Sequence, residues 1–298
     1  MAHVGTRDWI LIVVLGLGWG SSFLCNAILV REIGPLWVSC GRVFFGACAL
    51  WIILHSLGKR PVVPWDKIGP LTIFGMLHFG LPLALYPLAQ EGLASGVTGI
   101  INAMTPIFVV IVSHFWPGGE SATKLKTLGV LVGFGGIVIL ALPELRGGEA
   151  SAVWAICIAL LAPVSYACAL NYLRRLLGID RVLMTALSMT AAAIVLAPLA
   201  YIMEGLPRLT SLEGWVSMLF AGIVLTGAFF AILMRLVTRV GATTASTVTF
   251  IAPVSAVGLG ALVLNEAILP AHIAGMVLIF VGLLIIDGRF RRWFQAIS

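Results

Sequence analysis

The sequence predicts an all-α membrane protein of ten transmembrane helices, built as two inverted repeats of five helices each. Composition is the first observation behind this prediction: 60% of the 298 residues are hydrophobic, 10% are charged and the mean hydropathy is +1.10. Soluble domains are usually about 45–50% apolar and about 25% charged. A water-soluble core cannot hide so large an apolar excess, so lipid is the expected solvent.

An internal duplication is the second observation. Four residues of the first half recur in the second half at a nearly constant offset: Pro106, Glu120, Gly129 and Gly136 are matched by Pro253, Glu266, Gly275 and Gly282. The offset is 146 for the last three pairs (266 − 120, 275 − 129 and 282 − 136) and 147 for the prolines (253 − 106). Self-similarity at a fixed offset indicates a repeated structural unit. We expect the repeats to cover residues 1–145 and 146–298.

Apolar stretches of about 20 residues, the length that crosses a bilayer as a helix, recur along the whole chain. Ten are predicted, at residues 8–30, 35–57, 67–90, 92–116, 124–142, 150–173, 182–203, 212–236, 242–264 and 270–288. The first stretch lacks a short apolar core followed by an A-x-A cleavage site, so we interpret it as a retained helix. The connections are short, which leaves no room for a further soluble domain.

The orientation follows from the count of spans and from the basic residues. Because five is an odd number, the second repeat must enter the membrane from the opposite side, and the repeats are inverted. Of the 18 Lys and Arg residues, fourteen fall on the side of the two termini, three fall on the other side and Arg42 lies within a span. Basic residues concentrate in cytoplasmic loops. Both termini are therefore expected in the cytoplasm, and the net charge of +6 needs no nucleic-acid partner.

Cysteine usage argues against a disulfide framework or a metal site. The five cysteines all fall within predicted spans, in an odd number and without metal-ligand spacing. We interpret them as small packing residues. Neither a metal nor another cofactor is expected.

Together these features resemble the EamA-type carriers of the drug/metabolite transporter superfamily. The resemblance covers essentially the whole chain and includes the two Pro…Glu…Gly series, the segment Trp19–Phe23 and the arginine within Ser39–Phe45. The chain departs from the family's pattern at Asn265, where glycine usually precedes the glutamate. The resemblance implies a transporter and not an enzyme, located in the bacterial inner membrane. Among the carriers of amino acids, other metabolites and drugs, it looks most similar to bacterial amino-acid exporters, including the aromatic ones.

Two ionisable side chains within spans are candidates for the transport site. Arg42 lies about seven residues from the outer end of its span, roughly 10 Å deep. It could dock a substrate carboxylate or close a gate, or it could bond to helix-end carbonyls or extend toward the interface. His78 could bond substrate or titrate near neutral pH, or it could be a neutral histidine bonded to a carbonyl freed by Pro82. No Asp or Glu accompanies these residues at mid-membrane, which favours transport without strong proton coupling.

Polar and aromatic residues of several spans complete a predicted substrate cavity. Trp19, Ser22 and Asn26 lie on one face of the first span. The other members are Tyr86, Asn102, Ser165, Tyr166, Asn171 and Thr249. A mostly apolar lining with a few hydrogen-bonding groups suits a zwitterion with an apolar side chain. The alternative for each residue is an interhelical hydrogen bond that joins two spans, worth about 0.6 kcal/mol.

The repeated prolines and glutamates have predicted structural roles. Pro106 and Pro253 are candidate hinges, with static kinks as the alternative. Glu120 and Glu266 precede the fifth span of each repeat, where a carboxylate accepts amide hydrogens at the positive end of a helix. The repeated glycines offer small faces for helix packing or for a homodimer, although a monomer is expected.

The sequence thus predicts export of amino acids, aromatic and other apolar ones above all, or of similar small metabolites. The expected mechanism is alternating access, in which the spans at 67–90, 92–116, 212–236 and 242–264 move against the rest. The alternatives are a multidrug carrier and a nucleotide-sugar carrier, although the latter needs several buried cations for its phosphates. An intramembrane enzyme is disfavoured because the sequence holds no catalytic motif, and a sensor lacks a soluble output domain. The expected partners are a small-molecule substrate and the lipid bilayer.

Overall fold

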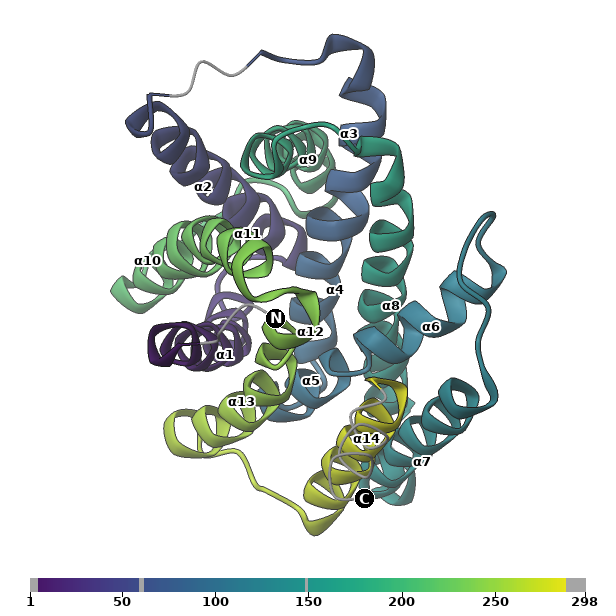
Figure 1. Cartoon of the computed structure of the whole chain (residues 1–298). Coiled ribbons are helices and arrows are strands. Elements are labelled where there is room, and N and C mark those ends of the chain that lie inside the picture. Colours follow the sequence, from purple (N-terminus) through teal and green to yellow (C-terminus); the bar gives the residue numbers. More distant parts are fainter. Residues whose placement is uncertain (1–4, 59–61, 148–149, 288–298) are drawn as a thin grey trace.

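The computed structural model describes residues 5–58, 62–147 and 150–287, and within these ranges the chain is helical without strands (Figure 1). Each repeat has five spans, and the third and fourth spans are interrupted in both. In the first repeat the elements are α1 (Thr6–Leu29), α2 (Pro35–Ser56), η1 (Trp65–Lys67), α3 (Ile68–Gly75), η2 (Met76–Gly80), α4 (Leu81–Gln90), α5 (Ser95–Asn102), α6 (Thr105–Phe115) and α7 (Lys124–Gly147).

The second repeat follows the same order. Its elements are α8 (Ala150–Tyr172), η3 (Leu173–Leu176), α9 (Arg181–Glu204), α10 (Leu212–Leu219), η4 (Phe220–Ala228), α11 (Phe229–Val240), α12 (Ala242–Ala245), α13 (Val248–Leu264) and α14 (Pro270–Asp287). Among the described residues, nine helical segments are long and apolar enough to cross a membrane, and α13 is a shorter apolar helix. With α13 as the tenth span, the predicted fold class is confirmed.

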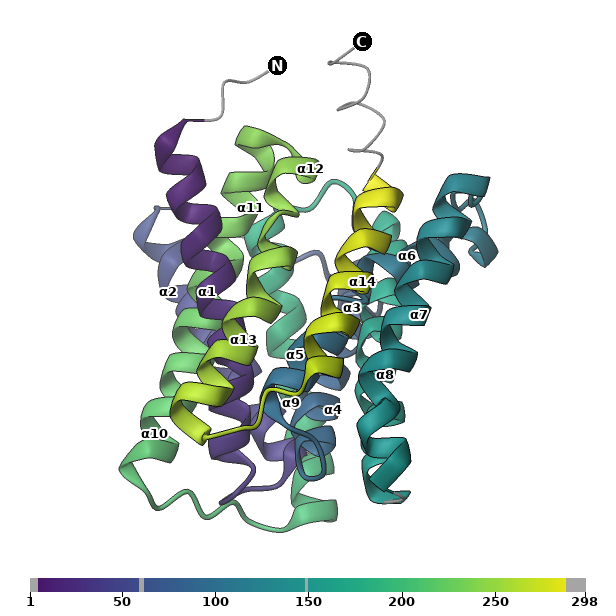
Figure 2. The same cartoon turned by 90° about the horizontal axis from the view of Figure 1, so that it is seen from below.

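The two ends of the bundle can be told apart by the first and last helices. α1 begins and α14 ends at one end, here called the termini end, while α1 ends and α14 begins at the opposite, distal end (Figure 2). Ten crossings place the start and the finish of the chain at the same end, as the sequence analysis requires.

The third span of each repeat contains a π-helical segment, η2 in the first and η4 in the second. Glycines mark both segments at a constant offset: Gly75 and Gly80 correspond to Gly222 and Gly227, and both differences equal 147. π-Helical turns occur mostly as short insertions, frequently at functional sites. Their recurrence at matching positions is a further trace of the duplication, and both segments reach the central cavity described below.

A two-fold relationship between the repeats is visible where α7 packs against α14. A Cβ atom at Gly136 would lie 2.7 Å from the Gly275 carbonyl oxygen, and one at Gly129 would lie 2.7 Å from the Gly282 carbonyl oxygen. Gly129 and Gly275 are repeat mates, as are Gly136 and Gly282. Each glycine therefore contacts the mate of the other, as residues on either side of a two-fold axis do. These faces are occupied within the chain, so they do not supply the dimer surface considered from the sequence.

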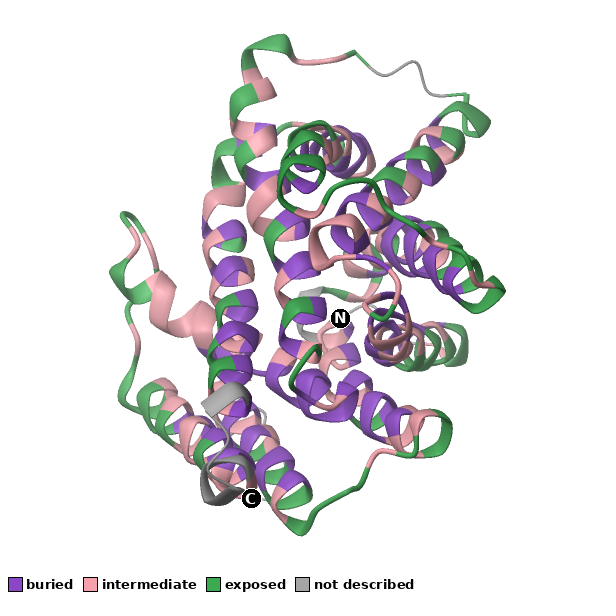
Figure 3. Ribbon diagram, turned by 180° about the vertical axis from the view of Figure 1, so that it is seen from behind, coloured by how far each residue is buried: buried purple, intermediate pink, exposed green. Residues whose placement is uncertain are grey.

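Apolar side chains lie both inside the bundle and on its periphery. Buried residues face the interior, and exposed ones face outward (Figure 3). Large exposed hydrophobic residues recur on the outward faces of the spans, for example Leu131, Ile194, Ile202 and Leu262. A soluble protein rarely exposes so extensive an apolar surface, whereas a lipid-facing bundle requires one.

The fourth span of each repeat is broken, but not at matching residues. Residues 103–104 interrupt the span between α5 and α6, and residues 246–247 interrupt it between α12 and α13. Pro106 lies in the first turn of α6, where its missing amide donor costs nothing. Pro253 lies inside α13, one turn beyond the break. The two candidate hinges therefore differ in position relative to the break, and their movement stays a prediction.

Candidate functional site

A cavity of about 290 Å³ lies among helices of both repeats. Nine of the eleven predicted cavity residues line it, namely Trp19, Ser22, Asn26, Arg42, His78, Tyr86, Asn102, Tyr166 and Thr249. The lining also includes Phe23, Phe79, Thr105, Thr226 and Phe230, which the sequence analysis did not select. The structure thus gathers residues from α1, α2, α8 and the third and fourth spans of both repeats around one space. That this space holds a substrate stays a prediction.

Arg42 is the most unusual residue of the cavity, because it is 3% exposed and carries a charge. Its Nη1 donates to Asn26 Oδ1 at 2.8 Å, and its Nη2 and Nε lie 3.2 and 3.4 Å from Thr226 Oγ1. No carboxylate forms an ion pair with it among the residues that the structure describes. A buried charge is ordinarily compensated by an opposite charge. Among the described residues, the guanidinium bonds to the side chains of Asn26 and Thr226, and not to helix-end carbonyls.

The π-helical segment η4 positions Thr226 for this contact. The Thr226 hydroxyl donates to the Ala221 carbonyl, five residues earlier, at 2.7 Å. That bond directs the hydrogen away from Arg42 and leaves the oxygen free to accept from the guanidinium. Regular α-helical periodicity does not anticipate an insertion of this kind, so the sequence analysis missed Thr226.

His78 sits within a group of aromatic rings. Its imidazole stacks on Phe74 at 5.1 Å between centroids with an interplanar angle of 9°, and it meets Tyr166 edge-on at 5.2 Å and Phe230 at 5.8 Å. Its Nδ1 is buried and forms no hydrogen bond with the described residues. The alternative considered for His78, a bond to a carbonyl freed by Pro82, is thus not seen at this nitrogen.

The aromatic lining is held by specific hydrogen bonds. Tyr86 donates its hydroxyl to Asn102 Oδ1 at 2.7 Å, which ties the third span to the fourth. Trp19 donates its indole N–H to the Leu225 carbonyl at 2.9 Å, which ties α1 to η4. The Thr249 hydroxyl donates to the Ser246 carbonyl and stabilises the turn before α13. These bonds fix the rings so that a flat, apolar group can pack between them.

Two predicted cavity residues lie away from the lining. Ser165 donates to the Leu77 carbonyl at 2.7 Å, and Asn171 bonds to the Ala167 carbonyl at 3.0 Å and to the Ser113 hydroxyl at 2.9 Å. Both residues therefore join α8 to neighbouring segments. This is the alternative role that the sequence offered for each of them, an interhelical hydrogen bond. Helical spacing alone does not tell which face of α8 meets the cavity.

The model of the EamA-like transporter family matches residues 8–142 and again residues 153–287. The chain belongs to the EamA-like transporter family. The second match begins and ends 145 residues after the first (153 − 8 and 287 − 142). This shift is close to the offset of the repeated motifs. The protein is therefore a multi-span membrane transporter.

Several relatives resemble this transporter over most of their length. The uncharacterized transporter YoaV of Bacillus subtilis is 28% identical over 285 residues, covering 94% of this chain and 97% of the relative. The uncharacterized inner membrane transporter YedA of Escherichia coli K12 is 26% identical over 249 residues, covering 81% and 78%. A crystal structure with 19% identity superposes with a TM-score of 0.65 and covers 94% of this chain and 97% of the other, a likeness of fold alone.

The repeated glutamates of this EamA-like transporter have different partners. Glu266 accepts hydrogen bonds from the backbone N–H groups of Ser95 at 2.7 Å and of Gly96 at 3.0 Å. It therefore stabilises the start of α5 in the other repeat, and not the start of α14 as predicted. Asn265 makes this possible, because it adopts the left-handed conformation (φ 56°) that ends α13 and turns the chain.

Among the described residues, Glu120 accepts no hydrogen bond from the backbone amides at the start of a helix. Its carboxylate pairs with Lys126 at 2.8 Å on the exposed surface, and this hydrogen bond lowers the pKa of Glu120. The expected contact with amides of the following helix is absent from the described residues, because α7 begins four positions later at Lys124. The two glutamates occupy matching positions in sequence but opposite ends of the bundle, so their surroundings differ.

Proposed function

We propose that this transporter exports amino acids, with aromatic and other apolar side chains favoured, by alternating access at the Arg42 cavity. The observation that carries the proposal is the buried Arg42 guanidinium, which has no anionic partner among the described residues. A substrate carboxylate would supply the missing charge in bidentate geometry. The aromatic rings around it suit an apolar side chain.

The size and charge of the cavity disfavour the alternative substrates. About 290 Å³ lies at the lower end of the range of about 300–1,000 Å³ that is usual for small-molecule sites. Arg42 is the only Lys or Arg among the described lining residues, whereas the phosphates of a nucleotide sugar would require several cations. A cationic drug would be repelled by the buried guanidinium. A small carboxylate-bearing metabolite therefore fits best.

Contacts on the distal side of the cavity support alternating access. Phe23 and Tyr86 line the cavity and meet edge-on at 5.3 Å. Gln90 donates its Nε2–H to the Phe23 carbonyl at 2.9 Å, and Glu266 holds the start of α5 beside them. These four residues, here called the distal layer, lie between the cavity and the distal end. We infer a state closed at that end, which the third and fourth spans would open by moving.

The direction of transport depends on the orientation in the membrane. We take the termini end as cytoplasmic, because fourteen of the 18 basic residues fall on that side. The distal end is then the outer face. Glu213 lies at the distal end and Lys124 at the termini end. In intact cells an impermeant thiol reagent should therefore label a Glu213→Cys variant more than the wild type, and a Lys124→Cys variant no more than the wild type. The opposite pattern would reverse the orientation.

Counterflow in proteoliposomes tests the proposal. Protein-containing vesicles loaded with an unlabelled amino acid should accumulate the same labelled amino acid, and phenylalanine, tryptophan and leucine should exchange faster than lysine or glutamate. Because no carboxylate lines the cavity among the described residues, exchange should be insensitive to an imposed pH gradient. Failure of every amino acid to exchange would overturn the assignment. A strict requirement for the gradient would overturn the uncoupled mechanism.

A further inference from the structure

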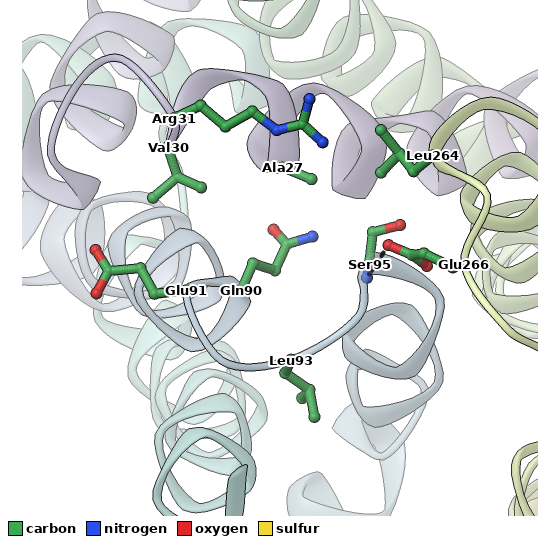
Figure 4. A pocket seen from close by; sticks show the side chains of 9 residues that line it. All are labelled: Ala27, Val30, Arg31, Gln90, Glu91, Leu93, Ser95, Leu264 and Glu266. Atoms are coloured by element: carbon green, nitrogen blue, oxygen red, sulfur yellow. Dashed lines mark hydrogen bonds between the residues drawn. The ribbon is translucent and has the colours of Figure 1, made fainter. Parts of the chain in front are cut away.

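A second pocket, of about 480 Å³, opens at the distal end beyond the distal layer (Figure 4). Its lining includes Arg31, Gln90, Glu91, Ser95 and Glu266. It shares no lining residue with the Arg42 cavity. The proposed transport mechanism leaves this pocket without a role.

The pocket contains a cationic side chain, Arg31, and an anionic one, Glu91, which do not form an ion pair with each other. Arg31 follows the end of α1, and Glu91 follows the end of α4. Neither side chain forms an ion pair with any residue that the structure describes. In Figure 4 the Arg31 guanidinium lies across the pocket from the Gln90 amide, and Glu91 lies on the far side of that amide from Ser95. The pocket thus offers a cation and an anion at separate positions.

Two buried polar atoms of the pocket lack partners. Ser95 is 1% exposed, and its hydroxyl oxygen forms no hydrogen bond among the described residues. The Gln90 Oε1 atom is also buried and unpartnered, while its Nε2–H is held by the Phe23 carbonyl. Leaving the hydrogen bond of a buried polar group unmade is destabilising. In native proteins such groups need an explanation, and a missing ligand is one.

Helix ends add an electrostatic preference. α1, α4 and α13 all end at this pocket, so three carbonyl-bearing helix termini with partial negative charge face it. The one helix that starts there, α5, has its first amides already occupied by Glu266. A ligand cation is therefore favoured near Glu91 and Gln90, and a ligand anion is favoured at Arg31.

We propose that this pocket is a second binding site, for a small zwitterion of the α-amino-acid class. Arg31 takes the carboxylate, and Glu91 takes the ammonium group. The ligand class rests on the proposed function. Since Gln90 and Glu266 belong to both the pocket and the distal layer, a bound ligand touches the residues that close the transport cavity on this side.

Chemical protection of Arg31 tests the site. The full-length protein in lipid nanodiscs is treated with phenylglyoxal, which modifies accessible guanidinium groups, and each arginine is followed by peptide mass spectrometry. Saturating phenylalanine should slow the modification of Arg31 about tenfold, in keeping with a charge-assisted hydrogen bond. Arg208, exposed in the loop between α9 and α10 at the same end, is the internal control and should react at an unchanged rate.

Variants and analogues separate this site from the Arg42 cavity. An Arg42→Gln variant should keep the protection of Arg31, whereas Glu91→Gln should require about tenfold more phenylalanine for the same protection. Phenethylamine, which lacks the carboxylate, should not protect. Unchanged modification of Arg31 in saturating phenylalanine, or protection lost in Arg42→Gln, would overturn the second site. Counterflow of phenylalanine without protection of Arg31 would contradict the second site and support the proposed function. Protection of Arg31 without counterflow would support the second site and contradict the proposed function.

Discussion

Glu266 in the second repeat accepts a hydrogen bond from the Ser95 backbone amide in the first, at 2.7 Å. Two other glutamates at the distal end make the same kind of contact across the repeats. Glu204, at the end of α9, accepts from Leu36 and Trp37 at the start of α2, and Glu32 accepts from residues at the start of α10. Each carboxylate satisfies amides that a helix start leaves unbonded. Three carboxylates at the distal end thus each hold the start of a helix of the other repeat.

Replacement of Glu266 by glutamine should loosen the start of α5. The carboxylate accepts two amide hydrogens, and the amide has a single oxygen for both and no charge. A charge-assisted hydrogen bond contributes about 1.5–3 kcal/mol, so amide exchange at the start of α5 should rise about tenfold or more. Hydrogen–deuterium exchange measured by mass spectrometry checks this. Glu120→Gln is the matched control, and equal exchange in the two variants would contradict the role of Glu266.

Thr226→Val should weaken substrate binding at Arg42. The variant keeps the shape of the side chain and removes the oxygen that accepts from the guanidinium. A hydrogen bond to a charged group contributes about 1.5–3 kcal/mol, and the guanidinium, left with its bond to Asn26, becomes more mobile. The concentration for half-maximal counterflow should therefore rise about tenfold. Thr226→Ser, which keeps the acceptor, should behave like the wild type, and an equal defect in both variants would argue against this role.

Gly136→Ala should destabilise the fold, and its neighbour Gly135→Ala should not. A methyl group at Gly136 would lie 2.7 Å from the Gly275 carbonyl oxygen, whereas one at Gly135 meets only Leu278 Cδ2 at 3.5 Å. Overpacking of this kind typically costs about 1–3 kcal/mol, and alanine is otherwise the better helix former. The melting temperature in detergent should therefore fall in Gly136→Ala and stay unchanged in Gly135→Ala. Equal melting temperatures would contradict the close packing of α7 against α14.

Glu32 should make stability depend on pH below the ordinary range of a carboxyl group. Hydrogen bonds from the Ser211 hydroxyl, and from the Ser211 and Thr210 backbone amides, lower the pKa of Glu32 from 4.5 to about 2. Because its folded-state pKa is depressed, the stabilisation is present above the unfolded-state pKa and is lost as the pH falls toward about 2.

The melting temperature of the wild type should therefore exceed that of Glu32→Gln by a constant amount above about pH 5. The difference should shrink as the pH falls through 4 and 3. Glu213→Gln, which removes an exposed carboxylate of α10 nearby, is the control for a lost charge. A difference that stays constant down to pH 3 would show that these hydrogen bonds do not discriminate between the ionised and the neutral carboxyl group.

Much of the fold was predictable because it depends on local composition and on repetition. Lipid dictates long apolar helices, so the spans could be located from hydropathy, and Arg42 stood out because a charge within a span needs a reason. The constant offset between Gly129 and Gly275, and between Gly136 and Gly282, predicted the repeats, and the odd number of spans in each predicted that they are inverted. The glycine pairs then met across the two-fold axis between α7 and α14.

The features that could not be predicted from the sequence depend on contacts between residues far apart along the chain. Nothing near Glu266 indicates that its partners lie at Ser95 and Gly96, about 170 positions away. Thr226 reaches Arg42 because a π-helical turn changes the direction of its side chain, and apolar periodicity carries no sign of that turn. Ser165 was assigned to the cavity because it lies in a span that contributes to the lining, although its face of α8 meets Leu77 instead.

The central claim is that Arg42 binds the carboxylate of a transported amino acid. Counterflow of labelled phenylalanine by Arg42→Gln, reconstituted beside the wild type and the Arg208→Gln control, tests it most directly, provided that all three melt at similar temperatures. We predict rapid exchange by the wild type and the control, and a loss of about a hundredfold or more in Arg42→Gln, since a buried bidentate pair is removed. Exchange by Arg42→Gln at the wild-type rate and half-saturating concentration would contradict the claim.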